Sequence, residues 1–253
     1  MSRAFFAWRA GRRRAGDDME TLTYVVLVPM VYGAVFTFLA GAVWRVWGIA
    51  RRPAFAPTLK IYPERRPAWL HALHDAFLMP MVRRHKPILW VFLMLLHGSI
   101  AFLILGHLEL FAPMPWLQVW PHEIFLGAGY LGVVNFVCLA FLLLRRFVPP
   151  AKDLSVPEDY VLLLVLLLAV VFGSQMHLAR RLYGFDGLGV PEYREYLMSL
   201  LRFAPSVDPV TGSGHAFLLT LHVFFANIFI AVFPFSKMMH AVLSIPANMM
   251  RRR

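Results

Sequence analysis

Long apolar runs separated by shorter polar stretches dominate this chain of 253 residues. Five runs are long enough to cross a hydrocarbon core of about 30 Å, which takes roughly 20 helical residues. These runs cover about 22–49, 88–112, 122–147, 159–180 and 214–246. Because a bilayer offers no water to satisfy peptide groups, and the runs show no ten-residue alternation, helices are favoured over a barrel. The pattern predicts an all-α, integral membrane five-helix bundle over residues 22–250.

The composition supports a membrane protein, since 59% of the residues are hydrophobic and only 15% are charged. The single cysteine, Cys138, lies in the third run, where we expect it to be a small packing residue. One cysteine excludes an internal disulfide, a cysteine-ligated iron–sulfur cluster and covalent haem attachment through CxxCH. The chain also has no Walker loop and no dinucleotide glycine fingerprint. Histidine is therefore the main candidate for chemistry.

The basic residues predict an orientation through the positive-inside bias. Eight lysines and arginines lie in the stretch 50–87, and three arginines form the C-terminus, so both are expected in the cytoplasm. Five spans then place the N-terminus outside. The five arginines within residues 1–18 argue against an N-terminus on the outside. Either the basic residues of the other loops determine the orientation despite them, or, as we prefer, the native start is Met19 and part of the segment 1–21 is not native.

The net charge of +11 mostly reflects this topology, predicts contact with anionic lipid as a further consequence, and does not imply nucleic acid. Within the basic loop 50–87, the stretch "PAWLHALHDAFLMPMVRR" has the pattern of an amphipathic interfacial helix. We interpret this loop as a docking surface for a cytoplasmic partner. A solvated linker is the alternative.

Four histidines lie inside the apolar runs, where polar groups are costly and usually functional. His97 and His107 are ten residues apart in the second run, which gives a rise of roughly 15 Å. His222 and His240 are eighteen residues apart in the fifth, about five turns or roughly 27 Å. The two helices run in opposite directions, so His97 lies level with His240, and His107 with His222. The unequal rises require tilt or a bend, for which Pro234 is a candidate.

Two imidazoles facing each other across a bundle core provide the ligands of a six-coordinate b-type haem. Small residues near the histidines leave room for a flat macrocycle: Gly98, Ser99, Gly106 and Ala226. The alternative is that each histidine simply hydrogen-bonds a neighbouring helix. Four histidines that pair by depth favour two haems.

The histidine spacing and the stretch "FPFSKMMH", which ends at His240, resemble the membrane cytochrome b subunits of the nitrate reductase gamma type. This group includes the membrane subunits of heterodisulfide reductase and of the DsrMKJOP complex. The resemblance covers roughly 85–250. It implies two b haems with bis-histidine iron, the inner held by His97 and His240 and the outer by His107 and His222.

The stretches "KPILWVFLMLLHGSIAFLILGHLEL" and "YREYLMSLLRFAP" look more like the DsrM branch. That resemblance implies an electron-transfer subunit of a respiratory-type oxidoreductase complex in the cell (inner) membrane, with other membrane and extracytoplasmic subunits. Such subunits exchange electrons with quinone at the outer haem and pass them to a cytoplasmic iron–sulfur subunit. The substrate would belong to sulfite reduction or sulfur oxidation. A respiratory nitrate reductase gamma subunit is the second interpretation.

A non-haem transporter or structural anchor is a third hypothesis, from a different class. It lacks support, because the sequence has no evident inverted repeat and no membrane-embedded carboxylate cluster. Absence of a Soret band from the purified protein would favour it.

Further polar residues are assigned through the resemblance. His122 and Glu123 are candidates for the quinone site, with an interfacial polar cap as the alternative. Arg180 and Arg181 can pair with haem propionates or anchor a helix end. Lys237 can serve a propionate or extend to the membrane interface.

Overall fold

The computed structural model describes residues 18–51, 67–114, 129–183, 188–212, 214 and 216–252, and every element in these ranges is a helix. The longer helices are α2 (Pro29–Ala50), α5 (Pro87–Leu108), α7 (Gly129–Arg145), α8 (Pro157–Tyr183) and α11 (Ala216–Val232). The shorter ones are α3 (Ala68–Leu78), α4 (Pro80–His85), α9 (Val190–Leu201), α10 (Asp208–Thr211) and α12 (His240–Arg252). The same ranges contain three 3₁₀ turns: η1 (Lys152–Leu154), η2 (Phe233–Phe235) and η3 (Lys237–Met239).

Four helical segments in this part of the chain are long and apolar enough to cross a membrane: Asp18–Ala50, Pro87–Leu108, Pro157–Leu178 and Ala216–Phe235. The prediction of an all-helical, multi-pass membrane protein is confirmed at this level. The predicted run 122–147 falls partly outside the described residues, and its described portion includes the shorter apolar helix Tyr130–Arg145. The fifth span therefore stays a prediction.

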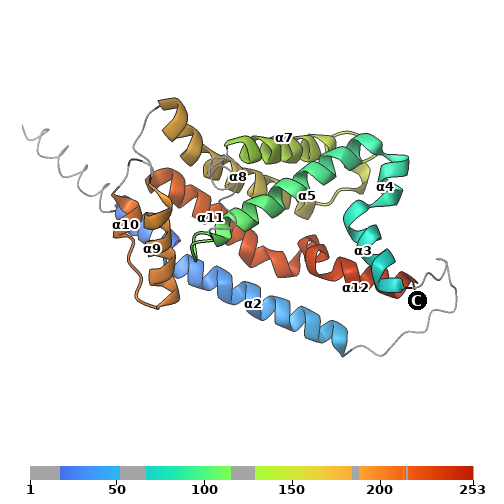
Figure 1. The fold of residues 1–253 in the computed structure, drawn as a ribbon, viewed down its shortest axis with the longest axis horizontal. Coiled ribbons are helices and arrows are strands. Elements are labelled where there is room, and N and C mark those ends of the chain that lie inside the picture. The colour runs from blue at the N-terminus through green and yellow to red at the C-terminus, as the bar shows by residue number, and fades with distance from the viewer. Residues whose placement is uncertain are drawn as a thin grey trace, which may run out of the picture.

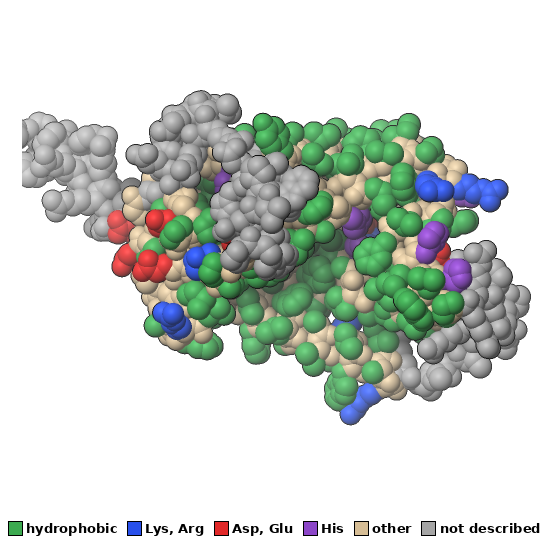
Figure 2. Space-filling view, viewed as in Figure 1, with side chains coloured by type: hydrophobic (Ala, Val, Ile, Leu, Met, Phe, Trp, Pro, Cys, Tyr) green, Lys and Arg blue, Asp and Glu red, His purple; other side chains and the backbone are tan. Residues whose placement is uncertain are grey.

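The long helices form a connected row, in which α5 packs against α7, α7 against α8, α8 against α11, and α11 against α2 (Figure 1). Helices α9 and α10 lie at one end of the long axis, and α3 and α4 lie at the other, beside α12. Figure 2 shows hydrophobic side chains over the middle of the molecule and charged side chains mostly at the two ends. This distribution suits a protein whose middle lies in lipid.

Two apolar clusters hold the row together. One lies between α5 and α7 and is built on Leu96, Cys138 and Leu139. Cys138 is buried there, as expected of a packing residue. The other cluster joins α2, α9 and α11 near the opposite end and includes Leu27, Tyr196 and Leu219.

A turn at Val28 interrupts the first helical segment directly before Pro29, which has no amide hydrogen to donate. Side chains from other elements satisfy the carbonyls at this point: Asn227 Nδ2 donates to Val26 at 3.1 Å, and the Tyr196 hydroxyl donates to Leu27. Burial raises the pKa of the Tyr196 phenol above its usual range, so this donor stays protonated. These bonds tie α9 and α11 to the first segment.

The predicted run 214–246 is not one helix. Helix α11 ends at Val232, η2 and η3 follow, and α12 begins at His240. Pro234 cannot donate a helical hydrogen bond, and its ring disfavours continuation of the helix. Ser236 has an extended backbone, and its Oγ accepts from the Met238 amide at 3.1 Å. The interruption therefore lies at Pro234, where the unequal histidine spacing predicted a bend.

Gly41 of α2 lets that helix pack against the interruption. A Cβ added at Gly41 would lie 2.7 Å from Phe235 Cζ and 2.8 Å from Pro234 Cγ. Only a residue without a side chain fits at this distance. The path of the chain between α11 and α12 is thus supported by α2.

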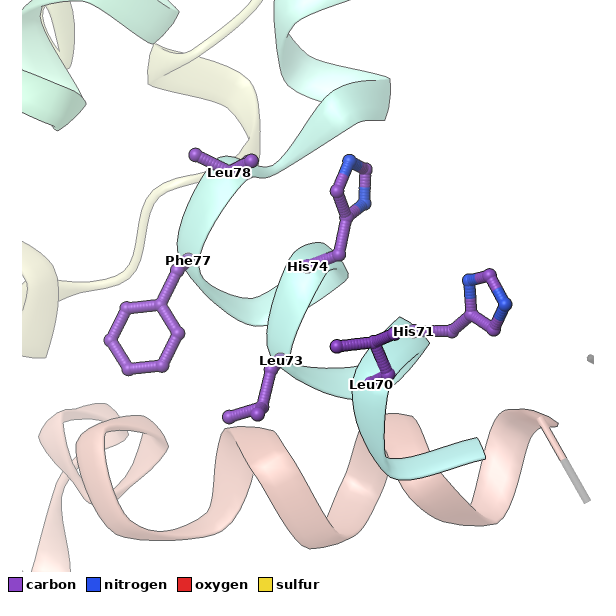
Figure 3. A pocket seen from close by; sticks show the side chains of 6 residues that line it. All are labelled: Leu70, His71, Leu73, His74, Phe77 and Leu78. Carbon is purple, nitrogen blue, oxygen red and sulfur yellow. The ribbon is translucent and has the colours of Figure 1, made fainter. Parts of the chain in front are cut away.

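The stretch of the basic loop that was predicted to form one amphipathic helix forms two helices, α3 and α4, which are separated at Met79, where φ is 43°. Helix α3 packs against α12, and its residue Ala72 is buried. In Figure 3, Leu73 lies on the side facing α12, whereas His71 and His74 point away from it. Leu70, Phe77 and their neighbours line a shallow groove of about 520 Å³ on this helix. Residues 52–66 of the same loop lie outside the described part.

Candidate functional site

Helix α5 presents two histidines ten residues apart. His97 Nδ1 donates to the Leu93 carbonyl at 2.7 Å, and His107 Nδ1 donates to the Leu103 carbonyl at 2.6 Å. Each acceptor lies four residues earlier, on the same face of the helix. Both imidazoles are consequently fixed by their own helix, with the same ring nitrogen engaged.

Two histidines on the other side are fixed in a similar way by different elements. His222 of α11 donates from Nδ1 to the Ala169 carbonyl of α8 at 2.8 Å. His240 opens α12 and donates from Nδ1 to the Lys237 carbonyl at 3.0 Å. The interruption at Pro234 separates these two histidines and redirects the chain between them.

The structure brings together the two pairs of histidines that were predicted to lie at the same level. The ring centroids of His97 and His240 lie 6.1 Å apart, with an angle of 77° between the rings. Those of His107 and His222 lie 6.4 Å apart, with an angle of 26°. Among the described residues, the extensive contacts of α5 are with α7 and α4, those of α11 are with α8, α2 and η2, and those of α12 are with α3 and η3. The two histidines of each pair therefore come from helices that are not closely packed neighbours.

These separations fit two imidazoles bound to one metal ion from opposite sides. A metal–imidazole bond is about 2 Å long. The centre of a five-membered ring with bonds of about 1.35 Å lies about 1.15 Å from each ring atom. Two such ligands in line place their centroids about 6.3 Å apart. The observed 6.1 and 6.4 Å bracket this value.

The donor chemistry also fits. All four Nδ1 atoms are engaged with backbone carbonyls, so each Nδ1 carries a proton, and in the neutral form of the ring Nε2 has the lone pair that binds a metal. A hydrogen bond to the second ring nitrogen is the usual feature of metal-bound histidine, since it fixes the tautomer and the ring orientation. Each pair thus offers two neutral imidazole ligands.

The described residues contain no group of three or more His, Cys, Asp or Glu side chains arranged to hold a metal ion. Two protein ligands are too few for a structural zinc site, which takes four. They suit an iron that brings four equatorial nitrogens of its own, as haem does. The residues of both pairs therefore fit haem better than a bare ion.

The predicted space for a macrocycle is supported at one small residue. No heavy atom would lie within 4 Å of a Cβ added at Gly98, so this side of α5 is open. Ser99 and Gly106 are buried instead, and the Ser99 hydroxyl donates to the Leu95 carbonyl at 2.6 Å. Their predicted place beside a macrocycle stays a prediction. Ala226 is half-buried on α11.

Gly173 sets the position of His222. A Cβ added at Gly173 would lie 2.9 Å from both Cε1 and Nδ1 of the His222 ring. Only glycine at this point of α8 lets the imidazole reach the Ala169 carbonyl.

Replacement of Gly173 by alanine is expected to displace the His222 ring and break its hydrogen bond. Loss of a hydrogen bond behind a metal ligand typically weakens metal binding by about tenfold or more. We expect about tenfold weaker retention of the haem at the His107–His222 pair, measured as haem loss to apomyoglobin. Gly33 is the matched control, because no atom lies within 4 Å of a Cβ added there. Equal retention in the Gly173→Ala and Gly33→Ala proteins would contradict this role.

The other predicted residues are placed as follows. The Lys237 ammonium lies 2.9 Å from an Asp159 carboxylate oxygen, so in this structure its partner is a protein carboxylate. Arg180 and Arg181 belong to the last turns of α8, and their side chains lie outside the described part. His122 and Glu123 also lie outside it. Their proposed roles stay predictions.

Two polar residues near the pairs were not singled out from the sequence. Asp159 is buried and holds Lys237, three residues before His240. Arg194 of α9 donates from Nη2 to the Glu109 carbonyl at 2.7 Å, two residues after His107. Asp159 follows Pro157 at a helix start, which is the typical position of an acid that caps a helix, so this signal was available. The position of Arg194 depends on tertiary packing.

Comparison with known proteins identifies a family that matches this chain and two relatives. The sequence profile of the family described as nitrate reductase gamma subunit matches residues 84–253. A relative from Archaeoglobus fulgidus, the Hdr-like menaquinol oxidoreductase cytochrome b-like subunit, is 26% identical over an alignment that covers 88% of this chain and 77% of the relative. The protein of the same name from Archaeoglobus profundus is 30% identical over 60% of this chain and 46% of its own length.

Proposed function

Because the chain belongs to the nitrate reductase gamma subunit family, we propose that it is a dihaem cytochrome b subunit that carries electrons across the membrane between quinone and a partner subunit. The two histidine pairs, with ring centroids 6.1 and 6.4 Å apart, carry this proposal. His97 and His240 hold one haem, and His107 and His222 hold the other. When bound, each haem accepts and releases one electron.

The protein fixes the ligands in advance. The Nδ1–H groups donate to backbone carbonyls, so Nε2 is the ring nitrogen that would bind a haem iron, without a change of tautomer. With two imidazoles at each site, the protein would supply two ligands to each haem. Such a site favours electron transfer over oxygen chemistry.

The names of the two relatives indicate the electron donor. Both are named as subunits of a menaquinol oxidoreductase. We infer that this chain exchanges electrons with menaquinol or a similar quinol at the His107–His222 haem, on the side that carries α9. His122 and Glu123 follow the C-terminal end of α5 in sequence and are the proposed acceptors of the quinol protons.

The partner is proposed for the opposite end, where α3, α4 and α12 lie (Figure 1). The exposed basic side chains Arg83, Arg84 and Lys86 follow the amphipathic helix α3. A cytoplasmic iron–sulfur subunit with an acidic face is the partner that this end suits, with the C-terminus inside the cell. A complex of the DsrMKJOP type, acting on sulfite or reduced sulfur, is the assignment that we favour.

Reduction by a quinol tests the proposed direction of entry. Anaerobic mixing of the purified protein with a soluble menaquinol analogue should reduce both haems, the outer before the inner, in a stopped-flow record of the α-band. His122→Ala and Glu123→Gln should each slow this reduction by on the order of tenfold, within the usual range for loss of acid–base help. His85→Ala on α4, at the other end of the molecule, is the control. Unchanged rates in both variants would exclude His122 and Glu123 from the quinone site.

A further inference from the structure

The first turn of α8 contacts the segment that leads into His240. Asp159 lies in this turn, with a side chain that is only 5% exposed. One of its carboxylate oxygens lies 2.9 Å from Lys237 Nζ, and the other lies 3.0 Å from Arg146 Nη1. A single buried carboxylate therefore joins the end of α7, the start of α8 and the turn η3.

Asp159 is fixed by its own helix as well. Its second carboxylate oxygen accepts from the Val156 amide at 3.1 Å, so the third residue of the helix reaches back to the residue that precedes it. A negative charge at a helix N-terminus is also stabilised by the helix dipole. Three donors satisfy the carboxylate, as burial of a charge requires.

Glu158 holds the same segment through its backbone. Its Oε1 accepts from the Lys237 amide at 3.0 Å. Lys237 is consequently held twice, by its main chain on Glu158 and by its ammonium on Asp159. The carbonyl of Lys237 in turn accepts the Nδ1–H of His240 at 3.0 Å. An unbroken series of contacts thus connects α8 to the imidazole.

We propose that Asp159 and Glu158 are positioning residues for His240, which orient its imidazole through Lys237 and set the charge around the inner haem. This inference rests on the proposed function, since it requires a haem between His97 and His240. It also gives Lys237 a task other than binding a propionate. The ammonium is part of the support for the ligand.

The charges of Asp159 and Lys237 predict opposite changes in the reduction potential of the inner haem. Reduction adds an electron to the haem, so a nearby negative charge disfavours the reduced state and a nearby positive charge favours it. Asp159→Asn removes a negative charge and should make the inner haem easier to reduce. Lys237→Gln removes a positive charge and should make it harder to reduce. If Asp159 and Lys237 had only a structural role, both variants would shift the reduction potential of the inner haem in the same direction.

The test is a redox titration of the purified full-length protein, followed by its haem absorption, with low-temperature EPR of the oxidised state. We expect each variant to shift the reduction equilibrium of the inner haem about tenfold, which is about 59 mV for one electron, in opposite directions. The outer haem should not change. The EPR signal of the inner haem should also move, because it reports the orientation of the axial rings. Asp153→Asn is the matched control, since Asp153 is an exposed carboxylate on the neighbouring turn η1.

Each result has a defined meaning. An unchanged potential and EPR signal of the inner haem in both variants would overturn the inference, as would shifts of the same sign or equal loss of both haems. Selective loss of the inner haem from Asp159→Asn would support it. Glu158→Gln keeps the oxygen that accepts from Lys237 and should leave the EPR signal in place, whereas Glu158→Ala should alter it. Failure of the proposed function can be distinguished from failure of this inference, because the wild-type protein itself would then lack the inner haem.

Discussion

Replacement of His240 by alanine is expected to remove one of two haems and to leave the other intact. His240 faces His97 with ring centroids 6.1 Å apart, so either substitution leaves the same iron with one protein ligand. His97→Ala and His240→Ala should therefore abolish the same spectroscopic component. The haem content should fall from two to one per chain, and electron transfer through the membrane should fall by more than about tenfold, since even partners behind a ligand cost that much. Haem quantification and redox titration of each variant measure this.

The double variant makes the test stricter. If His97 and His240 hold one haem, the double variant should resemble either single one, because residues that act as a unit are not additive. A His97→Ala, His107→Ala double variant should lose both haems. His74→Ala is the control, since His74 is exposed on α3 and points away from α12 (Figure 3). Loss of different components in His97→Ala and His240→Ala would contradict the pairing.

Replacement of His222 by alanine is expected to remove the other haem and also to destabilise the protein. His222 lies 6.4 Å from His107 between ring centroids, so His107→Ala and His222→Ala should abolish the same spectroscopic component. His222 additionally donates to the Ala169 carbonyl across the α8–α11 contact. Loss of that donor removes a hydrogen bond between two helices, which contributes about 0.5–1.5 kcal/mol to the free energy of unfolding.

Comparison of His107→Ala with His222→Ala separates the loss of the haem from the loss of stability. His107 donates only within its own helix, to Leu103, and its side chain is exposed. His222→Ala should therefore lower the thermal midpoint of the protein in detergent more than His107→Ala does, while both lose the same haem and the quinol-driven reduction. Equal midpoints would show that the His222–Ala169 bond contributes no stability. Loss of the inner haem from either variant would contradict the assignment of the pairs.

The histidine pairing could be predicted from the sequence because the order of the histidines along two oppositely directed segments sets their levels. The ten-residue spacing lies within one helix, α5, but the eighteen residues from His222 to His240 do not form five continuous turns, since the chain is interrupted between α11 and α12. The same arithmetic required a bend, and Pro234 was the residue that disfavours a continuous helix. The structure has a longer interruption, from Phe233 to Met239, because Ser236 has an extended backbone and caps the following turn.

The contacts around the ligands could not be predicted in this way. That Gly173 lies against His222, and that Asp159 bridges Arg146 and Lys237, depends on which helices pack together and in what rotation. Hydrophobic runs do not specify this, since nearly every face of a membrane helix is apolar.

The central claim is that two histidine pairs each hold one b-type haem. A pyridine haemochrome assay on the purified wild-type protein, expressed with sufficient haem and normalised by amino-acid analysis, tests it most directly. The account predicts about two haems per chain, all of the b type. One haem or none per chain would contradict it, because at least one histidine pair would then have only a structural role.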